Sequence, residues 1–294
     1  MLELQSLSRR FGPVVALDGV SLTVRPGVLT GFIGANGAGK TTTMRIVVGV
    51  LAPDAGEVRW GGAPVGPDER RRFGYMPEER GLYPKMTVLD QLVFFARLHG
   101  VSPAGAQRRG RELLEELGLG ARAGDQLQKL SLGNQQRAQV AAALVHDPDL
   151  LLLDEPFSGL DPVAVDALAA LLRRRAAAGV PVLFSSHQLD LVERLCDDVV
   201  IVHRGRVQAA GHAADLREQR AGARFALRLG GDAGWLRDEP GLRVLDVDGP
   251  QALVELPDGA GDQRLLATAL RHGPVHEFRR ALPTLAEIFR ETVS

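Results

Sequence analysis

The spacing of hydrophobic positions changes several times along the chain, and each change predicts a different kind of element. Residues 2–7 alternate between apolar and polar side chains, and the short run 21–24 ends at the turn residues Arg25, Pro26 and Gly27. Alternation with a period of two, bounded by Pro and Gly, is typical of strands joined by turns. The beginning of the chain is therefore predicted to form a small antiparallel β subdomain.

Farther along, apolar runs that predict strands alternate with segments that have helical periodicity. The strands are expected at 28–33, 150–153 and 180–185, and the helices at 43–51, 135–144, 163–178 and 189–195. Residues from about 87 to 130 also carry helical periodicity, which predicts a helical insertion after the first strands. Strands and helices that alternate in this way form parallel sheets, so the predicted fold class is α/β.

The pattern changes again after Gly211. Strands are predicted at 223–229, 242–247, 252–256 and 275–281, with helices near 232–237 and 262–271 between them. The order β-α-β-β-α-β is typical of a ferredoxin-like unit. We therefore expect a small C-terminal α+β domain at 218–294, separate from the α/β domain at 1–217.

Composition and charge argue against several classes of protein. The 294 residues include 35 basic and 36 acidic side chains, and the formal net charge of -1 gives no reason to expect a nucleic acid partner. Cys196 is the single cysteine, which excludes an internal disulfide. The first residues lack the pattern of a secretory signal, and no apolar run reaches the roughly 18 residues of a membrane span. We therefore expect a cytoplasmic protein that serves a membrane, if at all, from outside the bilayer.

A glycine-rich loop follows the first apolar run and opens a helix. Residues 34–41 read Gly-Ala-Asn-Gly-Ala-Gly-Lys-Thr, which fits G-x-x-x-x-G-K-[ST] without a gap. Glycines let backbone N–H groups turn toward a phosphate, Lys40 reaches the β- and γ-phosphates, and the Thr41 hydroxyl binds magnesium. The expected nucleotide-binding residues of this loop are Gly34, Asn36, Gly37, Gly39, Lys40, Thr41 and Thr42.

Two acidic residues follow the run of four leucines at 150–153. Asp154 and Glu155 are expected at the carboxyl end of a buried strand, where ligands of open α/β sheets bind. Asp154 is predicted to bind the magnesium ion, and Glu155 to orient or deprotonate the attacking water. A solvated turn is the alternative, but the nearby phosphate loop favours a P-loop NTPase.

Residues 130–137, Leu-Ser-Leu-Gly-Asn-Gln-Gln-Arg, resemble the signature sequence of the ATP-binding-cassette (ABC) ATPases. As in that family, the segment opens a helix and precedes the acidic pair, with Ser131 standing 23 residues before Asp154. The resemblance implies that Ser131, Gly133 and Gln135 bind the nucleotide held by the glycine loop of the other subunit. An ordinary helix capped by Ser131 is the simpler reading, but it leaves the other motifs unexplained.

Three more positions match the same family. Residues 157–161, Phe-Ser-Gly-Leu-Asp, resemble its D-loop, which implies that Asp161 signals across the dimer. His187 resembles the switch histidine that contacts the γ-phosphate, so the implied catalytic residues are Glu155, His187 and Lys40. Phe11, placed 29 residues before Lys40, is a candidate for stacking on adenine.

One position departs from the family pattern. Glu78 stands where the family has a glutamine, and an ionised carboxylate cannot donate a hydrogen bond. Contact with magnesium or water is therefore expected of Glu78. The surrounding stretch 78–88 and the closing stretch 283–289 resemble the ATPases of sodium-extrusion and drug-export ABC systems.

The resemblance implies an ABC nucleotide-binding domain at 1–217, with a helical subdomain at about 87–145. It implies an ATPase that uses ATP and Mg²⁺, works as a homodimer with composite ATP sites, and powers export through separate integral membrane permease subunits. The implied location is the cytoplasmic face of the cell membrane.

Two other functions are compatible with the fold. A soluble ABC protein that acts on nucleic acid or ribosomes is disfavoured because there is one cassette, with only 90 residues between Thr41 and Ser131. A regulatory module without hydrolysis is disfavoured because Lys40 and Glu155 are both present.

Overall fold

The computed structural model describes residues 1–79, 81–256 and 261–293, so Arg80, within the export-type stretch at 78–88, lies outside the described residues. The chain forms two compact units, Met1–His212 and Ala213–Ser294. The position expected for the domain boundary, after residue 217, falls inside helix α8 (Ala213–Arg220).

The first unit begins with the antiparallel β subdomain that the alternating pattern predicts. Its strands pair in the order β2-β1-β4-β5, and every pairing is antiparallel. The bounds are β1 (Leu2–Phe11), β2 (Val14–Val24), β4 (Ala55–Trp60) and β5 (Ala63–Pro64). One face of this subdomain packs into the main core through apolar residues that include Leu2, Leu7 and Leu17.

The core sheet has the order β10-β9-β3-β8-β7-β6, and only the edge pair β9–β10 is antiparallel among its described pairings. Its strands are β3 (Leu29–Ile33), β6 (Phe73–Met76), β7 (Leu150–Leu153), β8 (Val182–Ser186), β9 (Asp198–His203) and β10 (Arg206–His212). Every residue of β3, β7 and β8 is buried, which explains their continuous apolar runs. The helices of this region are α1 (Lys40–Val47), α2 (Pro67–Arg70), α6 (Pro162–Ala177) and α7 (Leu189–Leu195).

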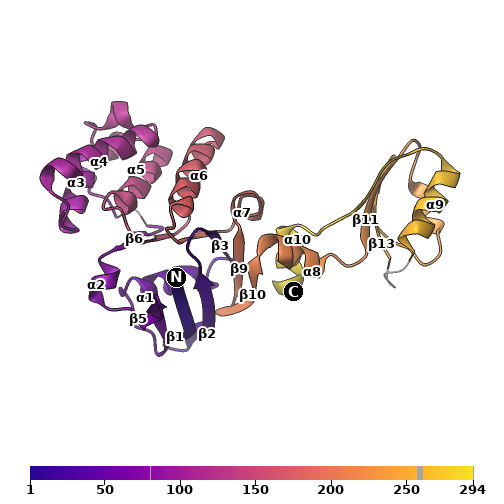
Figure 1. The fold of residues 1–294 in the computed structure, drawn as a ribbon, viewed down its shortest axis with the longest axis horizontal. Coiled ribbons are helices and arrows are strands. Elements are labelled where there is room, and N and C mark those ends of the chain that lie inside the picture. Colours follow the sequence, from indigo (N-terminus) through magenta and orange to yellow (C-terminus); the bar gives the residue numbers. More distant parts are fainter. Residues whose placement is uncertain (80, 257–260, 294) are drawn as a thin grey trace. The chain divides into compact units, whose positions relative to one another are not determined.

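The helical subdomain lies between β6 and β7 in the sequence and forms the group of helices drawn in magenta in Figure 1. It contains α3 (Val88–Leu98), α4 (Pro103–Glu116), two 3-10 turns, η1 (Gly120–Arg122) and η2 (Leu127–Lys129), and α5 (Leu132–Leu144). Hydroxyl groups of Thr87, Ser102 and Ser131 cap the three α-helices, accepting a backbone N–H of the first turn in each case.

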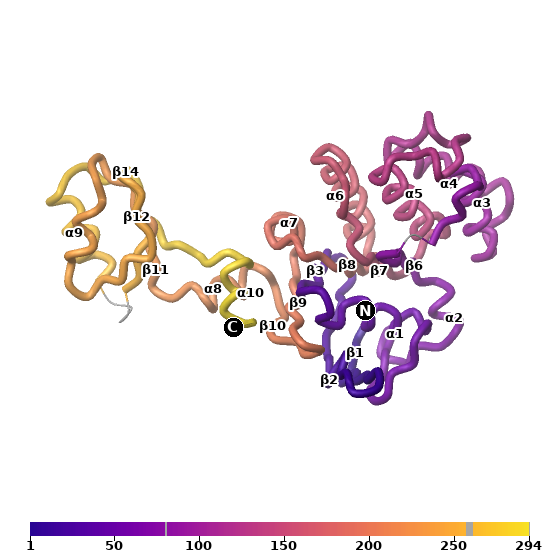
Figure 2. The backbone as a smooth tube through the Cα atoms, turned by 180° about the vertical axis from the view of Figure 1, so that it is seen from behind, coloured from indigo at the N-terminus to yellow at the C-terminus, as the bar shows by residue number. Residues whose placement is uncertain are grey.

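The second unit contains the expected four-stranded antiparallel sheet, in the ferredoxin-like order β12-β13-β11-β14. Its elements are β11 (Arg224–Leu229), η3 (Gly234–Asp238), β12 (Arg243–Asp248), β13 (Gln251–Glu255), α9 (Asp262–His272) and β14 (Val275–Arg280). The first of the two helices expected in this unit is only the short 3-10 helix η3. Helix α10 (Leu285–Val293), which the pattern did not predict, packs against α8, as Figure 2 shows from behind.

Candidate nucleotide-binding site

The glycine loop connects β3 to α1, and its backbone excludes larger side chains. A Cβ at Gly34 would lie 2.6 Å from the carbonyl oxygen of Val202. Gly39, the residue before α1, has φ of 109°, and a Cβ there would lie 2.8 Å from the carbonyl oxygen of Ala16. Both positions require glycine, because neighbouring backbone carbonyl groups leave no room for a Cβ. The loop leads into the N-terminus of α1, where backbone N–H groups are free to bind an anion.

A cavity of about 480 Å³ opens over this loop. It brings together most of the residues that the sequence assigns to the nucleotide, and its lining is Phe11, Val14, Val15, Ala16, Asn36, Gly37, Ala38, Gly39, Lys40, Thr41, Thr42, Glu78, Asp154 and Glu155. The Phe11 ring is 47% exposed, with the Arg9 guanidinium 5.0 Å from its centroid. A flat, exposed aromatic ring at the rim of the cavity is suited to stacking on a base.

The Lys40 ammonium lies inside the loop. Its Nζ donates hydrogen bonds to the carbonyl oxygens of Gly34, at 2.6 Å, and Ala35, at 3.4 Å, while the residue is only 7% exposed. Within the described part of the chain no ion pair of Lys40 is found. Its charge is therefore available to an anion that enters the cavity.

The acidic pair is held by hydrogen bonds at the carboxyl end of β7. Ser185, from the neighbouring strand β8, donates its hydroxyl to Oδ1 of Asp154 at 2.6 Å and accepts the N–H of Glu155 at 2.8 Å. Glu155 has a left-handed backbone, with φ of 52°, and its Oε2 lies 3.0 Å from Nδ1 of His187. The sequence motifs had not singled out Ser185, although a hydroxyl at the carboxyl end of a buried strand is a signal that could have found it.

The donor groups of the cavity fit a magnesium ion. Asp154 is buried, and its Oδ2 has no hydrogen-bond partner within the described residues. Thr41 and Glu78 line the same cavity. Those described residues contain no cluster of three His, Cys, Asp or Glu side chains that could enclose a metal. Magnesium typically binds one or two carboxylates and completes its shell with water and phosphate oxygens.

The same acidic cluster affects Tyr75 on β6. Burial, and then the nearby Asp154 carboxylate, raise the pKa of the Tyr75 hydroxyl above its usual value. The tyrosine therefore stays protonated beside the acidic pair.

Two glutamines of α5 hold the segments that carry Glu78 and Glu155. Gln139 is buried and donates to the carbonyl oxygens of Pro77, at 2.6 Å, and Glu79, at 3.1 Å. Gln136 donates to the carbonyl oxygen of Glu155 at 2.9 Å. The sequence interpretation missed both roles, because the pattern of a helix does not reveal which distant carbonyl groups its polar side chains meet.

The signature segment does not line this cavity. Ser131 caps α5 by accepting the N–H of Asn134, and Gln135 donates to the carbonyl oxygens of Leu127 and Leu130. Asp161 caps α6 through the N–H of Ala164 at 2.9 Å. Gly133 approaches the neighbouring loop, since a Cβ there would lie 3.1 Å from the carbonyl oxygen of Gly159. Within one chain, Ser131, Gly133, Gln135 and Asp161 are thus separate from the glycine-loop cavity.

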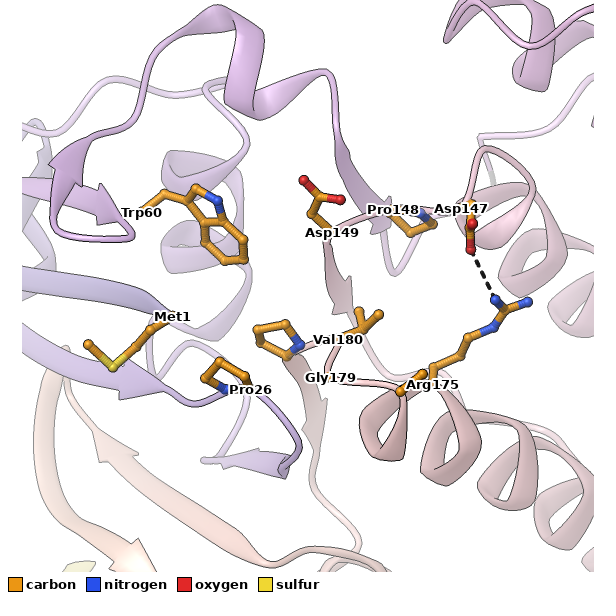
Figure 3. A pocket seen from close by; sticks show the side chains of 11 residues that line it. Met1, Pro26, Trp60, Asp147, Pro148, Asp149, Arg175, Gly179 and Val180 are labelled. Atoms are coloured by element: carbon orange, nitrogen blue, oxygen red, sulfur yellow. Dashed lines mark hydrogen bonds and ion pairs between the residues drawn. The ribbon is translucent and has the colours of Figure 1, made fainter.

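Figure 3 shows a second cavity, of about 460 Å³, beneath the amino ends of β7 and β8. Trp60, Pro26 and Pro148 line it, together with Arg175, which forms an ion pair with Asp147 at 3.1 Å. No glycine loop or helix N-terminus with a lysine faces this cavity, so we assign the nucleotide to the first one.

Comparison with known proteins matches both units. Residues 17–158 match the family model of the ABC transporter, and residues 211–293 match the C-terminal domain described as ATP-binding protein DrrA1-3-like. The uncharacterized ABC transporter ATP-binding protein YhaQ of Bacillus subtilis is 35% identical over 293 residues, which cover 100% of this chain and 98% of the relative. The chain belongs to the ATP-binding proteins of ABC transporters.

Two further relatives of this ABC protein carry functional names. The linearmycin resistance ATP-binding protein LnrL of Bacillus subtilis is 33% identical, over 79% of this chain and 73% of its own length. The Nod factor export ATP-binding protein I of Burkholderia lata is 37% identical, over 81% of this chain and 79% of its own length.

Solved structures agree with this assignment. An ATP-binding subunit of an ABC transporter is 37% identical and superposes with a TM-score of 0.69, over 75% of this chain and 93% of that one. The cassette MJ0796, solved as a dimer bound to ADP and Pi, shares the fold with a TM-score of 0.66 at 24% identity, over 72% of this chain and 98% of that one. The ABC protein described here is an ATP-binding and ATP-hydrolysing subunit. In its described part, no helix is long and apolar enough to span a membrane.

Proposed function

We propose that this ABC ATPase drives export through separate permease subunits, working as a homodimer on the cytoplasmic face of the membrane. The names of the linearmycin resistance and Nod factor export relatives support the direction of transport. The sequence stretches at 78–88 and 283–289 support it independently. The permease supplies the path for the cargo, and the chain described here supplies the energy.

The residues of the glycine-loop cavity bind ATP in this proposal. The N–H groups of residues 34–42 surround the phosphates at the start of α1, where the helix dipole favours negative charge. Lys40 leaves its carbonyl partners in the loop and pairs with the β- and γ-phosphates. Phe11 stacks on the adenine ring, which its exposed face permits.

Glu155 acts as the general base for the attacking water. Its carboxylate oxygen is kept in place by His187, and its backbone is fixed by Ser185 and Gln136. His187 holds the water and the γ-phosphate in line. Asp154, Thr41 and Glu78 would hold magnesium, directly or through water, and the ion would neutralise charge on the phosphate oxygens.

The signature segment serves the nucleotide of the second subunit. Ser131, Gly133 and Gln135 lie at the exposed N-terminus of α5, where Leu132 is 61% exposed, and Asp161 lies at the exposed start of α6. Surfaces of this kind are free to meet a partner chain. Each ATP would then bind between the glycine loop of one copy and the signature segment of the other.

The observation that carries the proposal is the 3.0 Å contact between His187 and Glu155, which lines the glycine-loop cavity. The test uses inverted membrane vesicles that contain the chain together with the multi-span protein of a neighbouring reading frame. We expect ATP to stimulate uptake of the transported cargo into inverted vesicles, and the variant Glu155→Gln to abolish this uptake. Uptake only into right-side-out vesicles would contradict export, and co-purification without any ATP-dependent transport would contradict a role in transport.

A further inference from the structure

The four-stranded sheet of the second unit has one covered and one open face. Helix α9 and η3 cover the first face, which packs a cluster of apolar side chains that includes Leu227, Val254 and Leu265. Because side chains alternate along a strand, the residues between these positions point to the other face. Among the described residues of this unit, no helix packs an apolar cluster against that second face.

The strand register arranges the open face in three rows across the sheet. The first row is Arg243, Glu255 and Arg224; the second is Asp246, Leu253, Ala226 and Arg279; the third is Asp248, Gln251, Arg228 and Glu277. The second and third rows run from the edge strand β12 to β14, whereas the first row ends on β11. The strand register therefore determines which side chains are neighbours on the open face.

The first row compensates its own charge. Glu255 lies 3.2 Å from Arg224 and 3.3 Å from Arg243, and Arg224 also pairs with Glu291 of α10 at 3.2 Å. Two arginines and two glutamates leave no net charge. The charges of this row are therefore balanced within the chain, without an ion pair to a second molecule.

The other two rows do not compensate theirs. Asp246 and Asp248 on β12 are exposed and form no ion pair with any residue that the structure describes. On the far side, Arg279 and Arg228 share one glutamate, Glu277, at 2.6 and 3.8 Å. The β12 edge thus has two negative charges in excess, and the β14 side has one positive charge in excess.

The middle of the second row is complementary in shape as well. Leu253 and Ala226 are register partners, large and small, and a hollow of about 310 Å³ lies over this part of the sheet. When two copies of the row Asp246, Leu253, Ala226, Arg279 face each other in opposite order, their side chains are complementary at each position. Aspartate meets arginine at both ends, and the leucine of each copy meets the alanine of the other.

From this pattern we propose that the open face binds the same face of a second copy of this chain. A two-fold axis parallel to the strands, lying between the two sheets, brings β12 of one copy over β14 of its partner. Such an isologous contact repeats each pairing twice. In the third row Asp248 approaches Glu277, and this repulsion is offset only in part, by Arg228 and by Arg279, which is shared between Glu277 and the incoming Asp246. The interface is independent of the ATP-sandwich dimer, because it requires no nucleotide.

The test measures self-association of the full chain by sedimentation velocity at low salt, without nucleotide and with EDTA. We expect a monomer–dimer equilibrium for the native chain. Asp246→Arg places arginines opposite each other at both contacts, and Arg279→Asp places carboxylates opposite each other. Each variant alone is expected to raise the dimer Kd at least about tenfold, since like charges in contact oppose association.

Mixing the two variants gives the decisive result. A heterodimer of Asp246→Arg with Arg279→Asp has an opposite-charge pair at both contacts, so the mixture should dimerise although neither variant does so alone. Arg237→Asp and Asp238→Arg, which make the same charge changes on η3 at the covered face, serve as controls and should leave the equilibrium unchanged. A native chain that stays monomeric up to about 100 µM, a small molecule that occupies the hollow without any dimer, or variants that fail to pair on mixing would each overturn the proposal.

Discussion

The Nδ1 atom of His187 lies 3.0 Å from Oε2 of Glu155, and the two side chains differ sharply in exposure. The glutamate side chain is 10% exposed, whereas the imidazole is 55% exposed. The Glu155 carboxylate is therefore largely buried in the protein, while the ring that contacts it remains exposed. This difference in exposure suits the proposed roles, in which Glu155 is a general base with a fixed position and His187 contacts the bound nucleotide.

Replacing Glu155 by Gln should separate binding from hydrolysis. The amide keeps the shape of the carboxylate but cannot accept a proton from water, so we expect turnover to fall by about 10²–10⁴-fold. ATP affinity should change less than about threefold. Phosphate release and nucleotide titration on the same preparation measure the two quantities.

Glu112→Gln, the same change on an exposed helical surface, is the matched control for Glu155. It should leave both quantities unchanged. Near-normal turnover in Glu155→Gln would remove Glu155 from the role of general base.

Glu78 is expected to tolerate replacement by Gln. Its carboxylate lines the cavity that receives the γ-phosphate, and two negative groups a few ångströms apart repel strongly where water is scarce. Hydrolysis by the isolated subunit should stay equal or rise by up to a few fold, as measured by steady-state phosphate release. If Glu78→Ala instead abolishes hydrolysis while folding and ATP affinity persist, Glu78 is catalytic itself and Glu155 is not the only group that activates water.

His146 should make the stability of the chain depend on pH. Burial, and then the stacked ring of His99 with its centroid 3.7 Å away, lower the pKa of His146 from 6.5 to about 4. The unfolded chain therefore takes up a proton near pH 6.5, whereas the folded chain resists until about pH 4. The free energy of unfolding should fall as pH drops through this window, by up to about 3 kcal/mol at roughly 1.4 kcal/mol per pKa unit.

Urea unfolding at a series of pH values measures this effect. His146→Phe keeps an aromatic ring beside His99 and should flatten the curve between pH 6.5 and 4. His276→Gln, at an exposed position, is the control and should keep the native slope. An unchanged slope in His146→Phe would assign the pH dependence to another group.

A chain that ends after His212 should still bind ATP. All residues that line the glycine-loop cavity belong to the first compact unit, and so do Ser131 and Asp161. We expect the shortened chain to fold and to keep its nucleotide affinity within about threefold, as measured by titration with a fluorescent ATP analogue. A folded truncation that has lost ATP binding would show that the second unit completes the site.

The elements that could be predicted are those with strong local signals. The leucine run at 150–153, the glycine loop and the helix begun by Ser131 need no distant partner to be recognised, and the structure contains all of them. The alternating pattern also identified the four strands of the second unit and, from their order, its ferredoxin-like sheet.

The parts that escaped prediction depend on contacts between distant segments. Helices α8 and α10 are short, and they pack against each other from opposite ends of the second unit. In the site, the bond from Ser185 to Asp154 joins residues 31 positions apart. Sequence periodicity carries no information about such pairs, whereas motif spacing did select the residues that the cavity brings together.

The two glutamines of α5 have a mechanical consequence. Gln136 and Gln139 stand one helical turn apart, and one is bonded to the segment of Glu155 while the other is bonded to the loop of Glu78. A rotation of α5 cannot displace one segment without pulling on the other. In the proposed mechanism, a displacement of the Glu78 loop would therefore reach the Glu155 segment through α5, within the same chain.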